Sequence, residues 1–245
     1  MLKQLSLAAM LMTGLLLSAC SRTPRPTTQP SAAAAKPAAP SAVNKYAWQS
    51  LFDGKTLGKW KVSDFAGHGE VHVEDGAIVI PMGNADMSGV TWTGTYPKMN
   101  YEISLEAKRV QGSDFFCALT FPVNDSNATL VLGGWGGSVC GISCLDYEDA
   151  ARNDTTKTRQ FKDGQWYRVR MRVTEDKLKA WLDDEPLVDV VYKGRKVDIR
   201  IECTESKPLG IATWNTTGAA RDIRIRELRP DEIEEARREA KEQEL

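Results

Sequence analysis

Short runs of alternating apolar and polar residues recur between residues 46 and 229. The clearest are residues 166–174 and 177–182, in which apolar side chains occupy every second position. Because successive side chains of a strand point to opposite faces, each run predicts a strand with one buried face. Asp75-Gly76 separates two such runs, as expected for a β-hairpin. A further alternating run, residues 197–203, predicts another strand.

Many short, half-buried strands predict two antiparallel sheets packed together, an all-β sandwich of the jelly-roll type. The pattern changes at Pro230, after which acidic residues crowd the first turn and Glu234 precedes Arg238 by four positions. These features predict a short charged helix over residues 230–245. Because the helix has few apolar residues, we expect it to be solvated or loosely docked.

Residues 1–20 have the form of an export signal: Lys3, an apolar run from Leu5 to Leu17, and the ending Leu17-Ser18-Ala19-Cys20. The run is too short to cross a bilayer, which needs ~20 apolar residues. Its ending resembles the bacterial lipobox, which implies cleavage before Cys20 and lipid attachment to that residue. A plain secretory signal is the alternative.

Residues 21–45 are rich in Pro, Ala, Thr and Ser and predict an extended tether, since they lack the large apolar residues that a core needs. Ser21 follows Cys20 where an acidic residue would favour the inner membrane, by resemblance to Gram-negative sorting. We therefore expect a lipid-anchored protein of the cell envelope, on the outer membrane and facing the periplasm or the exterior. The remaining residues 46–229 are long enough for one domain.

The charge balance is almost even, with 32 basic and 33 acidic residues and a net charge of −1. This balance argues against nucleic acid as a partner and leaves the lipid anchor as the only predicted contact with a membrane. If Cys20 carries lipid, the other cysteines permit three disulfide connectivities, among which the sequence does not choose. They are Cys117, Cys140, Cys144 and Cys203. Cys140 and Cys144 lie in one predicted strand, roughly 13 Å apart, which argues against a bond between them.

A longer motif, Leu-Phe-Asp-Gly-Lys-Thr-Leu at residues 51–57 followed by Trp60, resembles the opening of the 3-keto-disaccharide hydrolase family. Weaker matches follow at residues 73–76, 101–106 and 163–182, so the resemblance covers about residues 46–229. It implies a concanavalin A-like jelly roll that cleaves glycosides whose sugar is oxidised at carbon 3. The ketone acidifies the neighbouring C–H and permits elimination, which needs a general base and an acid.

The chain departs from the family in two stretches. The family patterns NSG(I)xxR and GxExQxxD correspond to residues 113–119 and 141–146, where the arginine and the glutamate-glutamine pair are absent. Asp146 stands at the position of the last aspartate of the second pattern.

Trp135 lies within the run Gly133-Gly134-Trp135-Gly136-Gly137. Four glycines leave the indole without shielding neighbours, and an exposed indole is a platform for the apolar face of a sugar. The alternative is a tight bend that buries Trp135 in the core.

Asp146 and Glu148 are two residues apart, so in a strand they would form a carboxylate pair like that of glycosidases, and we predict that both are catalytic. Asn153, in the polar loop that follows, is predicted to bind the substrate together with Trp135. Calcium is an alternative ligand for this oxygen-rich loop, and a solvated loop without ligand is another. No other metal or cofactor is predicted.

Two other polar patterns favour a simple structural interpretation. His68, Glu70, His72 and Glu74 recur at every second position. Gly67 and Gly69 suggest that the first part is loop, and the rest are expected to be outward residues of a half-buried strand, with metal ligands or a general base as the alternative. Arg168, Arg170 and Arg172 are expected on a solvated sheet face, with anionic glycans as the alternative ligand.

The sequence therefore predicts a carbohydrate-active domain and leaves two main hypotheses for its function, an enzyme and a non-catalytic binding module. An enzyme should bring two carboxylates, or a carboxylate and a histidine, into one cleft. A non-catalytic laminin-G-like module that binds glycans or proteins should show an aromatic platform without convergent acids. A purely structural envelope protein is a third alternative.

Overall fold

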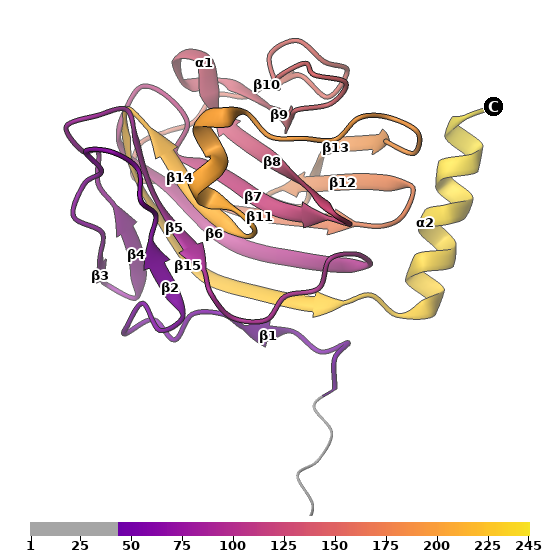
Figure 1. Ribbon diagram of the computed structural model, residues 1–245, viewed down its shortest axis with the longest axis horizontal. Helices are drawn as coiled ribbons and strands as arrows, with labels where there is room; N and C mark the ends of the chain where they lie inside the picture. The colour runs from indigo at the N-terminus through magenta and orange to yellow at the C-terminus, as the bar shows by residue number, and fades with distance from the viewer. Residues whose placement is uncertain (1–43) are drawn as a thin grey trace, which may run out of the picture. The chain divides into compact units, whose positions relative to one another are not determined.

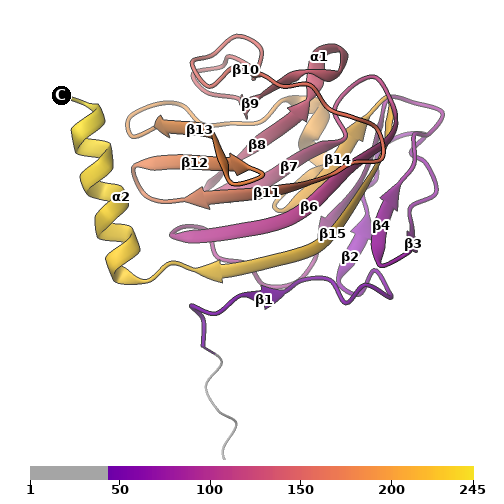
Figure 2. The same cartoon turned by 180° about the vertical axis from the view of Figure 1, so that it is seen from behind.

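Residues 44–245 are described by the computed structural model, and they form two antiparallel β-sheets packed face to face (Figures 1 and 2). This arrangement confirms the predicted all-β jelly-roll sandwich. The predicted signal peptide, Cys20 and most of the tether lie outside the described residues. Within the described part of the chain, no helix is long and apolar enough to cross a membrane.

The larger sheet has eight strands. In spatial order they are β13 (Glu185–Val191), β12 (Lys177–Leu182), β11 (Trp166–Val173), β6 (Tyr101–Gly112), β15 (Thr216–Glu227), β4 (Ala77–Ile80) and β3 (His72–Glu74), with β1 (Gln49–Ser50) paired to β15. The predicted runs 166–174 and 177–182 are β11 and β12, and they pair with each other as expected. Beside β1, the N–H of Leu51 donates to the carbonyl oxygen of Ile223.

The second sheet has seven strands. In spatial order they are β10 (Lys157–Thr158), β9 (Val139–Ser143), β8 (Ser126–Gly133), β7 (Cys117–Val123), β14 (Gly210–Trp214), β5 (Met87–Trp92) and β2 (Trp60–Val62). Two short helical segments adjoin this sheet. They are α1 (Gly134–Gly137), between β8 and β9, and the 3₁₀ helix η1 (Ile201–Ser206), before β14.

The core lies between the two sheets, where alternate side chains of each strand point inward. Leu105 and Val169 contribute to it from the eight-stranded sheet, and Leu119 and Leu130 from the seven-stranded sheet. A smaller apolar cluster lies on the other face of the seven-stranded sheet, where Cys203 of η1 packs with Ala118 and Ala212. The outer face of this sheet is therefore partly covered.

The predicted strand over residues 197–203 is wrong, since only Val197 takes part in β-pairing, as an isolated bridge to Leu145. Residues 201–206 form η1 instead, and Ile201 is exposed while Cys203 is buried. Alternation of apolar residues does not distinguish a short strand from a 3₁₀ turn when the segment is this short.

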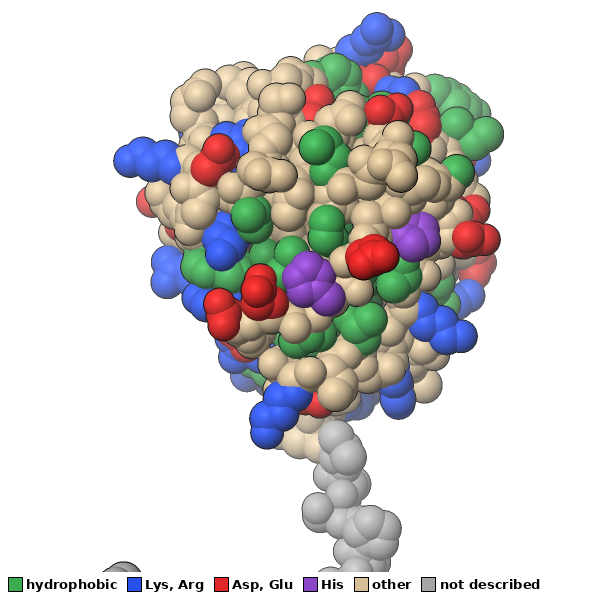
Figure 3. All heavy atoms as spheres, turned by 90° about the vertical axis from the view of Figure 1, so that its left-hand side faces the viewer, with side chains coloured by type: hydrophobic (Ala, Val, Ile, Leu, Met, Phe, Trp, Pro, Cys, Tyr) green, Lys and Arg blue, Asp and Glu red, His purple; other side chains and the backbone are tan. Residues whose placement is uncertain are grey.

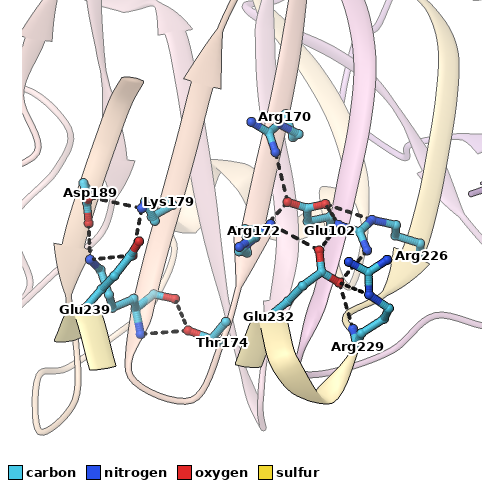
Figure 4. A network of polar contacts seen from close by, with 11 residues as sticks. Glu102, Arg170, Arg172, Thr174, Lys179, Asp189, Arg226, Arg229, Glu232 and Glu239 are labelled. Atoms are coloured by element: carbon cyan, nitrogen blue, oxygen red, sulfur yellow. Dashed lines mark hydrogen bonds and ion pairs between the residues drawn. The ribbon is translucent and has the colours of Figure 1, made fainter. Parts of the chain in front are cut away.

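The C-terminal helix α2 (Pro230–Gln243) lies at the side of the domain away from β2–β4 (Figures 1 and 2). Its presence was predicted, but the expectation of loose docking is wrong. Ala236 and Ala240 are buried, and Glu232 accepts hydrogen bonds from Arg226 of β15 at 2.7 and 2.8 Å. Glu239 accepts a hydrogen bond from Lys179 of β12 at 2.8 Å (Figure 4). Ionic contacts therefore dock a helix that has few apolar residues.

The outer face of the eight-stranded sheet holds a buried carboxylate, that of Glu102, which is 1% exposed. It accepts hydrogen bonds from Arg170, Arg172 and Arg226 (Figure 4). Arg170 also stacks on Trp181, with the guanidinium carbon 3.8 Å from the ring centroid. The predicted arginine stripe is thus engaged with acidic and aromatic partners, and Arg172 is mostly covered.

Candidate functional site

A pocket of about 250 Å³ opens on the outer face of the seven-stranded sheet. Thr129 and Val131 of β8 and Ser143 of β9 line it, because they alternate with core-facing Leu130 and Ile142. The other lining residues are Asp114, Phe115, Trp135, Arg200, Glu202, Cys203 and Trp214. We refer to these ten residues as the outer-face pocket.

Aromatic side chains from α1, from β14 and from the loop before β7 line the outer-face pocket. Trp135 lies in α1 and is 42% exposed. Of the two alternatives for this residue, a platform exposed to ligands and a side chain buried in the core, the structure has the first. Phe115 and Trp214 contact each other with ring centroids 6.2 Å apart. Asp114 holds the α1 turn in place, since its carboxylate accepts a hydrogen bond from the N–H of Gly136 at 3.0 Å. Gly136 has φ of 86°, a conformation that favours glycine.

An ion pair forms the charged wall of the pocket. Arg200 donates to both carboxylate oxygens of Glu202, at 2.8 and 3.3 Å. The hydrogen bond from Arg200 lowers the pKa of Glu202, and the same bond raises the pKa of Arg200. Arg200 also donates to Asp149 at 3.0 Å. Both members of this ion pair are therefore held ionised at neutral pH.

Asp146 and Glu148 do not line the outer-face pocket. Asp146 accepts hydrogen bonds from the Arg195 side chain at 2.8 Å and from the N–H of Lys196 at 2.9 Å. The Lys196 bond, followed by the Arg195 bond, lowers the pKa of Asp146. Because Asp146 has φ of 51°, the chain turns after β9, and two-residue spacing does not align Asp146 with exposed Glu148 as it would in a strand. Their catalytic role stays a prediction.

The side chain of Asn153 is fully occupied by hydrogen bonds to its own loop and to β9. Its side-chain N–H groups lie 2.8 to 3.0 Å from the carbonyl oxygens of Ile142, Glu148 and Asp149. Its side-chain oxygen accepts hydrogen bonds from the N–H and the hydroxyl of Thr155. The side chain stabilises the loop in this arrangement, and its predicted role in substrate binding stays a prediction.

The three aspartates of this loop have basic partners. Asp146 and Asp154 both pair with Arg195, and Asp149 pairs with Arg200. Across residues 44–245, no three His, Cys, Asp or Glu side chains are grouped closely enough to hold a metal ion. The calcium alternative stays a prediction.

Both histidines are exposed, on the face shown in Figure 3. Nδ1 of His72 lies 2.9 Å from the carbonyl oxygen of Glu70, and its Nε2 lies 4.0 Å from Glu74. His72 and Glu74 belong to β3, an edge strand of the eight-stranded sheet. Neither histidine lines the outer-face pocket.

The four cysteines of the domain are all buried and none forms a disulfide in the described part of the chain. Burial raises the pKa of Cys117 to about 12 and that of Cys140 and Cys203 to about 11. Cys203 lines the outer-face pocket as a neutral thiol.

Sequence reasoning found Trp135 but missed the residues that accompany it in the pocket. These are Asp114, Phe115, Arg200, Glu202 and Trp214. They are scattered over about 100 positions of the chain. Trp214 meets Phe115 because β14 pairs with β7, and Arg200 and Glu202 are brought in by η1, which contacts β5 and β14. Local periodicity did not indicate a site at Arg200 or Glu202, because it predicted a strand over the residues that form η1.

Comparison with known families identifies the domain. The profile of the 3-keto-alpha-glucoside-1,2-lyase-like domain matches residues 47–226. The chain belongs to this family. Membership confirms the resemblance seen in the opening motif and makes the domain one of a carbohydrate-active family. The family match ends before α2 begins at Pro230.

Two solved structures share the fold of this lyase-like domain at low sequence identity, and a third is similar at a lower TM-score. The Crh5 transglycosylase in complex with NAG is 10% identical, with a TM-score of 0.52 over 76% of this chain and 87% of that chain. A structure reported with endo-acting O-glycanases of the human gut microbiota that initiate mucin breakdown is 13% identical, with a TM-score of 0.52 over 76% and 100%. A Parabacteroides distasonis protein provisionally described as a glycosyl hydrolase is 16% identical, with a TM-score of 0.47 over 74% and 94%. No curated protein matches the sequence.

Proposed function

We propose that the domain binds glycosides of sugars oxidised at carbon 3, and that it does so in the outer-face pocket. The observation that carries this proposal is the convergence of three aromatic rings and an ionised Arg–Glu pair on one pocket of a lyase-like domain. Indole faces bind the apolar face of a sugar ring, and charged side chains bind its hydroxyl groups.

The size of the pocket suits one sugar ring. Its volume of about 250 Å³ lies just below the range of roughly 300–1,000 Å³ that accommodates larger, drug-sized ligands. Trp135 is the most exposed of the three aromatic residues. We assign it the stacking contact, with Trp214 and Phe115 forming the apolar wall behind the ring.

Binding is tested by titrating the purified full-length chain with methyl 3-keto-glucoside and with its unoxidised parent in a calorimeter. Trp135→Ala should weaken binding of the keto sugar about five-fold or more, since stacking on an aromatic ring contributes ~1 kcal/mol or more. Trp48→Ala is the matched control, because Trp48 is 39% exposed and lies outside the pocket. Equal affinity of the two variants would contradict the proposal.

Cleavage of the same glycosides is the second candidate function, favoured by two carboxylates in the pocket, those of Asp114 and Glu202. In the elimination, a base removes the proton at carbon 2 and the group at carbon 1 departs with the bonding electrons. The hydrogen bond from Arg200 lowers the pKa of Glu202, which keeps the carboxylate in the ionised form that can accept a proton and also makes it a weaker base. Asp146 and Glu148 remain the alternative pair, outside the pocket.

Release of the aglycone from aryl 3-keto-glucosides decides between these assignments. Loss of turnover in Glu202→Gln, but not in Glu205→Gln of the same helix, would place the base in the pocket. Loss in Asp146→Asn or Glu148→Gln would place it in the loop instead. Binding without turnover in the unmodified chain would support the non-catalytic, laminin-G-like module.

We also propose that the domain is a lipoprotein anchored through Cys20 in the cell envelope. The support is the lipobox-like ending of residues 17–20 and the Pro/Ala-rich segment after it. Labelled palmitate should be incorporated into the chain in bacterial cells and lost in Cys20→Ser, while Ser21→Ala should retain the label. Ser21→Asp should move the labelled protein from the outer to the inner membrane fraction. Label retained in Cys20→Ser would rule out this anchor.

A further inference from the structure

Arg200 has hydrogen-bonding capacity that the protein does not use. A guanidinium carries five N–H groups, and Arg200 makes three hydrogen bonds, two to Glu202 and one to Asp149. Two N–H groups therefore have no partner among the described residues. The side chain is 42% exposed and is the only Lys or Arg among the ten residues of the outer-face pocket.

The orientation of the guanidinium is determined from two sides. Glu202 binds it through a two-pronged contact, which restricts rotation of the planar group. Asp149 binds its NH1 atom from the loop after β9, and the Asp149 side chain is only 13% exposed. That carboxylate is itself held, since its other oxygen accepts a hydrogen bond from the N–H of Ala151 at 3.1 Å.

A ketone oxygen matches this site chemically. It can only accept hydrogen bonds, and a guanidinium can only donate them. An oriented cation with free N–H groups in a partly enclosed pocket is well placed to bind such an oxygen.

We propose that Arg200 recognises the carbonyl oxygen at carbon 3 of the bound sugar, and that Asp149 is the positioning residue for its guanidinium. The inference rests on the proposed binding of 3-keto-glycosides in this pocket. It gives the loop after β9 a role in the site through Asp149, without contact between that loop and the ligand.

The carbonyl stretching band of methyl 3-keto-glucoside, labelled with ¹³C at carbon 3, tests the proposal. The band should move to lower wavenumber when the sugar binds the full-length chain, because a charged donor weakens the C=O bond. In Arg200→Gln the shift should disappear and affinity should fall about 10- to 100-fold, the range for a hydrogen bond to a charged group.

Arg195→Gln is the matched control. Arg195 also donates three hydrogen bonds to two carboxylates, those of Asp146 and Asp154, but lies outside the pocket. This variant should keep both the band shift and the affinity. If Arg200→Gln fails to fold, Arg200→Lys is the second variant. It retains the positive charge but lacks the planar guanidinium, and it should give a smaller shift of the carbonyl band.

Asp149→Asn tests the positioning role and should broaden and reduce the band shift, with Asp154→Asn as its control. A full shift in Arg200→Gln, or sugar binding to the unmodified chain without any shift, would overturn the assignment of Arg200. An unchanged band in Asp149→Asn would overturn the positioning role. Absence of keto-sugar binding to the unmodified chain would overturn the proposed function itself, and this inference with it.

Discussion

The side-chain amide of Asn153 lies 2.8 Å from the carbonyl oxygen of Ile142 and ties the polar loop to β9. Through the same side chain the loop also closes on Glu148 and Asp149. Asn153 therefore helps to hold the backbone of Asp149, whose side chain contacts Arg200 of the pocket.

Asn153→Ala should lower the free energy of unfolding by about 2–4 kcal/mol, because several hydrogen bonds are lost and partly buried backbone groups lose their partner. Urea denaturation followed by fluorescence measures the change. Asn84→Ala, which removes a side chain without such bonds in the described structure, should change stability by less than about 0.5 kcal/mol. Similar values for the two variants would contradict the role of Asn153.

The docking of α2 should weaken in acid. The hydrogen bond from Arg226 lowers the pKa of Glu232 from 4.5 to about 2. A carboxylate whose pKa is lowered by folding stabilises the native state above its unfolded pKa, so this contribution is complete above about pH 4.5 and disappears toward pH 2. Unfolding free energies of the unmodified chain and of Glu232→Gln should therefore differ at pH 7 and converge as the pH falls through this range.

Glu234→Gln is the control for that experiment. Glu234 is exposed and pairs only with Arg237 of the same helix. Its substitution should change stability by about 0.5 kcal/mol or less at every pH. A constant difference between the unmodified chain and Glu232→Gln across the pH range would refute the assigned pKa shift.

Removal of the buried carboxylate at Glu102 should be strongly destabilising. Three arginines donate to it, and Glu102→Gln would leave their charges with reduced compensation. We expect a loss of about 3–5 kcal/mol in unfolding free energy, the range for breaking a buried ion pair. Glu106→Gln, which affects a more exposed pair with Arg221, should cost about 1 kcal/mol or less.

The domain cysteines should be unreactive in the native state. The thiolate is the reactive form, and burial raises the pKa of Cys117, Cys140 and Cys203 to about 11 or 12. Ellman's reagent at pH 8 should label them slowly in buffer and completely after unfolding in guanidinium chloride. Rapid labelling, or a disulfide between any two of them in mass spectra of the purified protein, would disagree with the structure.

The β-sandwich was predictable because its signal is local. Each hairpin, such as β11 with β12, shows its buried face in its own two-residue periodicity. The position of α2 was not predictable in the same way. Counting its apolar residues suggested loose docking, whereas Glu232 and Glu239 dock it through charges on distant strands.

The outer-face pocket could not be predicted from the sequence, for two physical reasons. Its residues come from separate elements that only the order of the sheet brings together, as with Asp114, Trp135 and Trp214. The Asp146 and Glu148 hypothesis assumed that β9 continues, but Asp146 and Tyr147 have positive φ and the strand ends at Ser143. Trp135 was found because its four glycine neighbours are unusual within a single short segment.

The pairing of β1 with β15 gives the domain a mechanical weak point. The ladder comprises only Gln49 and Ser50, opposite Ile225 and Arg224, with one further backbone hydrogen bond at each end, from Leu51 to Ile223 and from Glu227 to Lys45. Tension on the N-terminal end of the domain acts first on this two-residue strand, which can peel away while the long pairing of β6 with β15 stays intact. The first segment of the domain would then extend under load and absorb force before the sandwich and its pocket are distorted.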